Sequence, residues 1–285
     1  MQKRIIVILC GIGGAFLLQD WWSNHEPTIQ DRESWVWWAW IVGLLAFPFA
    51  MLVQVHRTAR ILDMNRKSAI VQPILMAHGM NVLLPSMLGD LYEIGALSQC
   101  SGRTKHAVFV RLIHRFSTTM SALLMLAGLA VGTHTPTYGF VLLAMAGLGP
   151  LVVDQLTPGW SVRVKLPGTE VPPAIEPIGI GATTIHMGWA LLQHSISATG
   201  VFFLAIGVGQ AVSPAIAAAM LSVADVVTYL PVPVGGLGVH HWGISNTTEW
   251  LGSAPDTLIA INHVWVVLGG MMCIMLANLA FDRAR

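Results

Sequence analysis

Long apolar runs set the first limit on how this chain can fold. Several approach the roughly 20 residues that a helix needs to cross a bilayer, and only 10% of the residues are charged. A soluble domain carries about 25% charged residues. The sequence therefore predicts an all-α polytopic membrane protein, with residues 1–285 forming a single integral membrane domain. The runs are Ile5–Trp22, Trp35–Val55, Ile70–Leu88, Ala107–Val131, Tyr138–Val153, Ile185–Gly209, Pro214–Leu230 and Thr257–Phe281.

Two of these runs differ from ordinary spanning helices. Ile70–Leu88 contains two prolines, a histidine and an asparagine, and Pro214–Leu230 contains Asp225 and leads into a stretch of prolines and glycines. Each is either a full span or a re-entrant hairpin, and the basic residues distinguish these models because cytoplasmic loops are enriched in lysine and arginine. If every run crosses, the loop lysines and arginines divide eight to five. If the two are hairpins, twelve lie inside and one outside.

The charge distribution thus favours about six full transmembrane helices plus two oppositely oriented re-entrant hairpins. We expect both termini in the cytoplasm and the protein in the cytoplasmic (inner) membrane. The first half, residues 1–153, holds a hairpin near 70–90, residues 154–184 form a Pro-rich cytoplasmic connector, and the second half, 185–285, holds a hairpin near 214–240. The pattern LPxxxGxL occurs in both hairpins. Matching segments in opposite orientation are typical of the inverted repeats of secondary transporters.

The Pro/Gly segments of the two hairpins interrupt helices at membrane depth. Such backbone is tolerated where it lines a polar cavity, which predicts that the two segments face each other across one central site. The alternative is that both are interfacial turns between ordinary helices. The predicted structural breaks are Pro85, Gly89, Pro231, Pro233, Gly235, Gly236 and Gly238.

Arg111 and Arg115 are the basic residues inside an apolar run. Being four apart, they share one helix face, and a charge inside a span usually points to the bundle interior and to function. Two guanidinium groups suit an anionic partner such as a phosphate, which makes both arginines candidate substrate-binding residues. For Arg111 the alternative is that its side chain snorkels to the cytoplasmic edge.

The candidate substrate-binding residues of the hairpins are mostly acidic. Asp225 lies in an otherwise apolar helix, where it would pair with Arg115, relay a proton or bind a cation. Asp90 and Glu93, at the exit of the first hairpin, are either part of the site or solvated at the interface. Asn81 precedes them in the same hairpin.

Other functional classes find little support in the sequence. His240 and His241 are adjacent, without the HExxH spacing of a metal site, and the three cysteines are scattered. Neither a metal nor a cofactor is predicted. Ser195 follows His194 directly, so the two side chains lie on different helix faces, and no GxSxG motif is present. The net charge of +1 carries no information about a nucleic-acid partner, because the distribution of charge matters more than its sum. No nucleic-acid partner is predicted.

The chain resembles the lysylphosphatidylglycerol synthase transmembrane family, the flippase-like membrane domain, from about Trp35 to Ala280. The resemblance rests on N-x-x-x-P-x-x-x-G-D from Asn81 to Asp90, a basic span with Arg115, and P-x-P-x-G-G-L-G-V at Pro231–Val239. It implies an integral membrane bundle with re-entrant segments. It also implies translocation of lipids, which in some members are aminoacylated phospholipids.

The chain departs from the family pattern at three places. Glu93 stands where members often have a basic residue, and His240-His241 stands where they often have a glutamate. The last apolar run offers Asn262 and His263 but no arginine. An acid and a base thus exchange places, which predicts a pair between Glu93 and His241 across the hairpins.

The sequence predicts a lipid flippase or transporter that moves an anionic phospho- or glycolipid across the inner membrane. The alternatives are a membrane-embedded enzyme acting on lipid phosphates, and a non-transporting scaffold in lipid or envelope assembly. No aminoacyl-transfer domain is expected beyond the last run, so the chain is not predicted to synthesise the lipid by that route. An enzyme is disfavoured because the sequence shows no nucleophile–base or metal constellation. Its expected partners are membrane lipids, with a homo-oligomer or a partner lipid-modifying enzyme left open.

Overall fold

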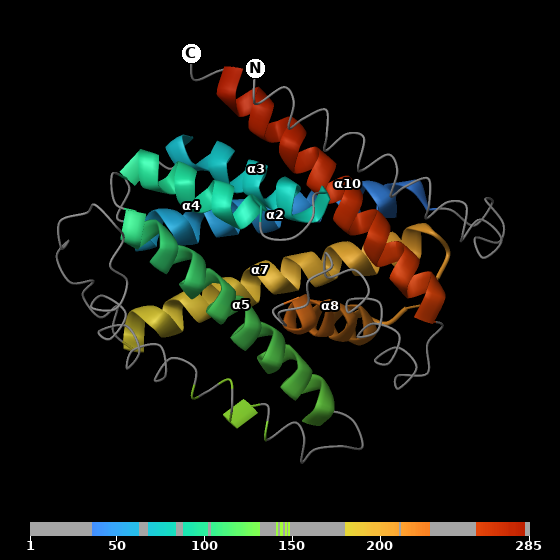
Figure 1. Ribbon diagram of the computed structural model, residues 1–285. Helices are drawn as coiled ribbons and strands as arrows, with labels where there is room; N and C mark the ends of the chain where they lie inside the picture. The colour runs from blue at the N-terminus through green and yellow to red at the C-terminus, as the bar shows by residue number, and fades with distance from the viewer. Residues whose placement is uncertain are drawn as a thin grey trace.

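A computed structural model of the chain is all-helical over the residues that it describes (Figure 1). These are residues 36–62, 68–83, 88–101, 104–131, 180–210, 212–228 and 255–282, with isolated positions between 141 and 148. No strand occurs in these ranges, so the all-α class is confirmed for them. The helices are α2 (Trp37–Ile61), α3 (Ser68–Leu83), α4 (Leu88–Ser101), α5 (Thr104–Val131), α7 (Ile180–Gly207), α8 (Pro214–Thr228) and α10 (Pro255–Asp282).

Two described helices are long and apolar enough to cross a membrane. They are α2 and the Gly181–Gly207 part of α7, which correspond to two of the predicted runs. Shorter apolar stretches lie in α8 and α10, at Pro214–Val223 and Trp265–Leu279. These helices are consistent with a membrane protein, while the number of spans and the side on which the termini lie stay predictions.

The packing of α2 along α7 is the most extensive contact between described helices. It depends on glycine, because a Cβ atom at Gly43 would lie 2.7 Å from Leu204 Cγ and 2.9 Å from the carbonyl oxygen of Gly200. Small residues at such a crossing let two helix backbones approach closely. Trp265 of α10 joins this contact by donating its indole N–H to the carbonyl oxygen of Gly43 at 3.2 Å.

Phe47 lies near the centre of the largest apolar cluster. Its ring centroid is 4.7 Å from that of Trp265 and 5.1 Å from that of His78. The cluster draws on α2, α3, α7, α8 and α10, so these helices share one core. Figure 1 shows α5 running from the end of α4 across α7 toward α8, and it packs on all three.

The predicted first hairpin has two helical arms. Its arms, α3 and α4, pack against each other, and the second arm continues to Ser101. The hairpin is therefore longer than the predicted range 70–90. Pro85 lies outside the described residues, whereas Gly89 lies in the first turn of α4. Gly89 is thus the second residue of α4, just after the interval between the two helices.

The predicted second hairpin is described only in its first arm, α8. Residues 229–254 lie outside the described part of the chain. The pairing of the two Pro/Gly segments and the inverted repeat therefore stay predictions. Most of the predicted connector also lies outside, but α7 begins at Ile180, so residues 180–184 are helical and not connector. The predicted residues outside the description are Pro231, Pro233, Gly235, Gly236, Gly238, His240 and His241.

Candidate functional site

The candidate site is built around Asp90, in the first turn of α4. The backbone N–H of Asp90 donates to Asn81 Oδ1 at 3.1 Å, and Asn81 Nδ2 donates to Asp90 Oδ1 at 2.5 Å. Asn81 thus accepts from a backbone N–H at the start of α4, which has no partner within its own helix. The two residues tie the end of α3 to the beginning of α4.

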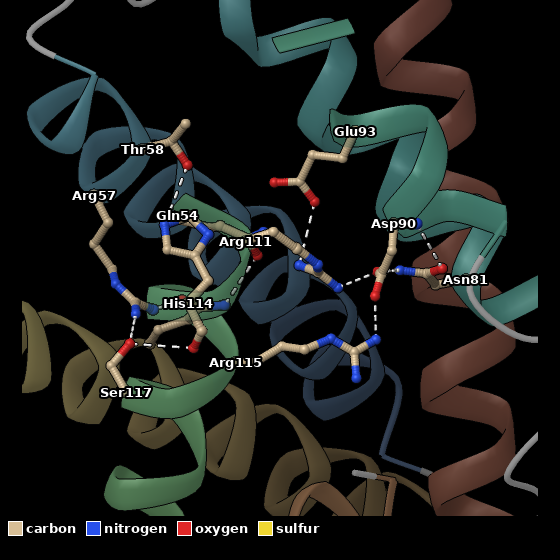
Figure 2. Close-up of polar contacts among 11 residues, drawn as sticks. Gln54, Arg57, Thr58, Asn81, Asp90, Glu93, Arg111, His114, Arg115 and Ser117 are labelled. Carbon is tan, nitrogen blue, oxygen red and sulfur yellow. Dashed lines mark hydrogen bonds and ion pairs between the residues drawn. The ribbon is translucent and has the colours of Figure 1, made fainter. Parts of the chain in front are cut away.

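Arg111 and Arg115 reach the same carboxylate from α5. The Arg111 guanidinium donates to Asp90 Oδ1, and that of Arg115 donates to Asp90 Oδ2 (Figure 2). Arg111 also pairs with Glu93, with Nη1 3.2 Å from Oε2. The predicted sharing of one helix face by the two arginines is what lets them converge on one acid. Four of the predicted substrate-binding residues therefore meet in one cluster with Asn81.

Both acids of this cluster are buried. Asp90 is 7% exposed and Glu93 is 1% exposed, so the alternative in which they are solvated at an interface is wrong. A buried carboxylate needs a paired and hydrogen-bonded partner, and the guanidinium groups meet that need. Arg111 points toward both acids, and its depth in a membrane stays a prediction.

Gly89 brings α4 close enough to α3 for these contacts. A Cβ atom at this position would lie 2.0 Å from the carbonyl oxygen of Ala77 and 2.5 Å from Asn81 Oδ1. Any side chain here would push Asp90 away from Asn81. The glycine of the Gly-Asp motif thus serves close packing of two helices.

A second polar cluster lies beside the first, between α2, α5 and α7. Arg57 is 1% exposed, and its guanidinium donates to Gln193 Oε1 at 2.8 Å and to Ser117 Oγ. His114 Nε2 lies 3.3 Å from Thr58 Oγ1 in the same cluster (Figure 2). Sequence analysis missed Arg57 by placing it in a cytoplasmic loop. The helical spacing of the residues after Val55 could have shown that α2 continues through it.

Asp225 lies in a different set of contacts. Its Oδ2 atom is 2.9 Å from Nδ1 of His194, and Nε2 of the same histidine is 2.9 Å from Ser222 Oγ. The alternative of a pair between Asp225 and Arg115 is therefore wrong, because Arg115 binds Asp90. Sequence analysis also missed the neighbour of His194. The partner is Ser222, which precedes Asp225 by nearly one helical turn, and not the adjacent Ser195.

Three predictions about individual residues can be compared with this geometry. The predicted pair of Glu93 with His241 involves a residue outside the described part, and Glu93 is bound by Arg111. No group of three or more His, Cys, Asp or Glu side chains that could hold a metal occurs among the described residues. Of the predicted site residues, the structure brings together Asn81, Asp90, Glu93, Arg111 and Arg115, whereas Asp225 pairs with His194.

Comparison with models of known protein families finds no match to this chain, and comparison with curated proteins finds none either. The family resemblance therefore rests on the motif residues themselves. Within the first motif, Asn81 and Asp90 are hydrogen-bonded partners and Gly89 is the position where the helices touch.

Proposed function

We propose that this chain is an integral membrane protein that moves an anionic lipid between the leaflets of the inner membrane. The observation that carries the proposal is the convergence of Arg111 and Arg115 on the two oxygens of one buried carboxylate. Two guanidinium groups placed in this way also match two oxygens of a phosphate group. The bound species is therefore a lipid with a phosphate in its headgroup.

A membrane location is supported by the outer face of α2. Trp38, Ile41, Leu45, Phe49 and Leu52 are all exposed and recur every three or four residues, so they form one apolar stripe. Apolar surface of this extent marks a contact with a membrane or another protein. The loop charges support the same location, since removing Arg57 from the cytoplasmic set leaves eleven inside to one outside.

Asp90 defines how the site would work. This carboxylate holds both arginines, so their charges are compensated within the protein. An incoming phosphate replaces Asp90 at the guanidinium groups, and the released carboxylate loses its contact between α4 and α5. The exchange links headgroup binding to a movement of the α3–α4 hairpin relative to α5. Two states of one packed contact are the usual basis of such coupling.

The proposal also has support from the motif resemblance. The family that the chain resembles is associated with lipid translocation, and the paired Asn81 and Asp90 belong to the motif that carries this resemblance. A purely structural scaffold would have little reason to keep four ionic side chains together at a helix junction, because burying charge costs more than burying apolar groups of similar size.

Leaflet exchange in liposomes tests the proposal. The purified protein is reconstituted into phosphatidylcholine liposomes that contain fluorescent phosphatidylglycerol, and an impermeant quencher reports how fast the inner-leaflet probe becomes accessible. We expect the variants Arg111→Gln and Arg115→Gln to slow this exchange about tenfold to hundredfold, since each loses a charged hydrogen bond worth about 1.5–3 kcal/mol.

The matched control is Arg60→Gln, because Arg60 is an exposed arginine at the end of α2. We expect this variant to exchange lipid at the wild-type rate. Folding of each variant is checked by its elution as a monodisperse species in detergent. Exchange no faster than in protein-free liposomes, or equal rates in the wild type and in both site variants, would contradict the proposal.

A membrane-embedded hydrolase is the second candidate, because Ser222, His194 and Asp225 contact one another in the order of a catalytic triad. Two observations speak against it. Ser222 is 0% exposed, and its hydroxyl donates to the carbonyl oxygen of Ala218 at 2.7 Å rather than to the histidine. A nucleophile requires access to substrate and a hydroxyl whose proton the base accepts. Labelling of Ser222 by a fluorophosphonate probe, absent in Ser222→Ala, would favour the hydrolase.

A further inference from the structure

His194 is a buried titratable residue that the arginine site does not use. It extends from α7 between two residues of α8, with Ser222 at its Nε2 atom and Asp225 at its Nδ1 atom, each at 2.9 Å. The side chain of His194 is 2% exposed and that of Asp225 is 32% exposed. The histidine of the pair is therefore buried, whereas the carboxylate is partly exposed.

The hydrogen bonds determine how many protons this group holds. A hydroxyl has a single proton, and that of Ser222 is donated to the carbonyl oxygen of Ala218. Ser222 Oγ must then accept from His194, so that Nε2 carries a proton. One further proton lies between His194 Nδ1 and Asp225 Oδ2, since two acceptors without a proton would not be held at 2.9 Å. Whether this proton is on nitrogen or oxygen, the group holds one exchangeable proton.

Binding or release of this proton changes the net charge of the group by one. With the proton the pair is neutral, and without it the pair carries one negative charge. Asp225 belongs to α8, which packs against α5, the helix that carries Arg111 and Arg115. A change of charge at Asp225 therefore occurs on a helix in contact with the helix of the arginine site.

Other titratable groups lie on the helices that pack against α7 and α8. Arg57 is held at Gln193, the neighbour of His194 in the chain. The remaining groups on these helices whose side chains the structure describes belong to α2, α5, α7 and α10. They are His56, Arg60, Arg111, His114, Arg115, His186 and Cys273.

We propose that His194 and Asp225 form a proton-binding site that couples proton movement to movement of the anionic lipid. This inference rests on the proposed function. Asp225 exchanges the proton with solvent, and Ser222 holds the imidazole with Nε2 protonated so that Nδ1 faces the acid. Binding a proton here removes one negative charge from α8, which packs on the arginine-bearing α5. This favours binding of an anionic headgroup, and by reciprocity the headgroup favours binding of the proton. A lipid of charge −1 and one proton then cross together without net charge.

A pH gradient across proteoliposome membranes tests the coupling. The fluorescent phosphatidylglycerol probe is followed as above, first with equal pH on both sides and then with a gradient of about one unit. For one proton per lipid, this gradient shifts the steady-state leaflet distribution of the probe up to about tenfold. We expect Asp225→Asn and His194→Gln to abolish this shift, and Asp225→Glu to retain part of it because it keeps a carboxylate.

Two variants of α7 provide matched controls. His186→Gln removes another buried histidine of the same helix, and Ser195→Ala removes a hydroxyl that bonds only within that helix, to the carbonyl oxygen of Leu191. We expect both to respond to the gradient as the wild type does. If the wild type exchanges lipid at equal pH but shows no shift under a gradient, or if the Asp225 and His194 variants keep the full shift, the coupling is refuted.

A second measurement separates failure of this inference from failure of the proposed function. Protons released on a pH step are counted with an indicator dye for the detergent-solubilised protein, which requires no lipid movement. The double variant Asp225→Asn/His194→Gln lacks both titratable side chains and is expected to release fewer protons than the wild type. Equal release would overturn the proton site. Lack of lipid exchange together with a normal proton count would overturn the proposed transport and its coupling, and would leave the site as a proton-binding group.

Discussion

Asp90 receives most of the contacts that hold the candidate site together. Its carboxylate accepts hydrogen bonds from Asn81, Arg111 and Arg115, while its backbone N–H donates to Asn81. A buried charge is stable only when its partners remain in place, and removal of one partner leaves the other charge uncompensated. The stability of the three-helix junction therefore depends on this one residue.

A double-mutant cycle measures this dependence. We expect Asp90→Asn to lower the free energy of unfolding by about 3 kcal/mol, because both guanidinium groups then face a neutral amide. Arg115→Gln added to Asp90→Asn should cost less than it does alone, with an interaction energy of about 0.5–3 kcal/mol. The measurement is denaturant unfolding in detergent. Strict additivity of the two substitutions would show that the pair does not contribute.

At the scale of elements, the α3–α4 hairpin is defined by close packing at Gly89. The position is inside a helix, yet its hydrogen atom faces the carbonyl oxygen of Ala77 and the side chain of Asn81. Gly95, on the same helix, has no neighbouring atom within 4 Å of where a Cβ atom would be. Close packing therefore requires a glycine at position 89 but not at position 95.

Substitution by alanine should distinguish these two glycines. Gly89→Ala is expected to destabilise the protein by about 3 kcal/mol, since overpacking at a tight contact costs 1–3 kcal/mol and this one is severe. Gly95→Ala should instead stabilise α4 by up to about 1 kcal/mol through helix propensity. Thermal unfolding in detergent measures both. Equal effects at the two positions would show that α3 and α4 are not packed as described.

The crossing of α2, α7 and α10 permits a second test at this scale. Trp265→Phe keeps an aromatic ring near Phe47 but removes the N–H that donates to the carbonyl oxygen of Gly43. We expect a loss of about 1 kcal/mol in unfolding free energy, the net value of one neutral hydrogen bond. Trp265→Ala provides the comparison and should cost about 3–5 kcal/mol. Equal losses in the two variants would indicate that the stabilisation comes from the indole N–H and not from the aromatic ring.

At the scale of the whole molecule, the distribution of basic residues predicts orientation. Arg57, 1% exposed in α2, no longer counts as a loop residue, but the remaining loop lysines and arginines keep the same bias. The bias concerns residues close to the ends of spans, where it sets orientation during insertion. Both termini are therefore expected on the cytoplasmic side.

Cysteine labelling in whole cells tests this orientation. In a background without the native cysteines, Gln2→Cys and Ala284→Cys should resist a membrane-impermeant thiol reagent until the cells are opened. Ser23→Cys, in the loop predicted to face outward, should react in intact cells and serves as the positive control. Labelling of both termini in intact cells would reverse the predicted orientation. Labelling of one terminus alone would place the two termini on opposite sides of the membrane.

Local patterns in the sequence were sufficient to predict the helices and part of the site. Apolar runs have a period that a single helix satisfies by itself, so the cores of α2, α5, α7, α8 and α10 follow from them. The spacing of Arg111 and Arg115 likewise places both on one face without reference to any other helix. The separation of the α3 and α4 arms was less predictable, because the apolar run continues past the end of α3 to Leu88, where α4 begins.

Only the tertiary structure decided which charges meet. The sequence offered Asp225 as an acid for Arg115, but the packing of α4 on α5 gives Arg115 the carboxylate of Asp90. Asp225 instead contacts His194 of α7. The packing of the helices likewise buries Arg57 and places Ser222 beside His194. The physical reason is that helical periodicity determines neighbours within one helix, whereas partners on different helices depend on how closely and at what register those helices pack.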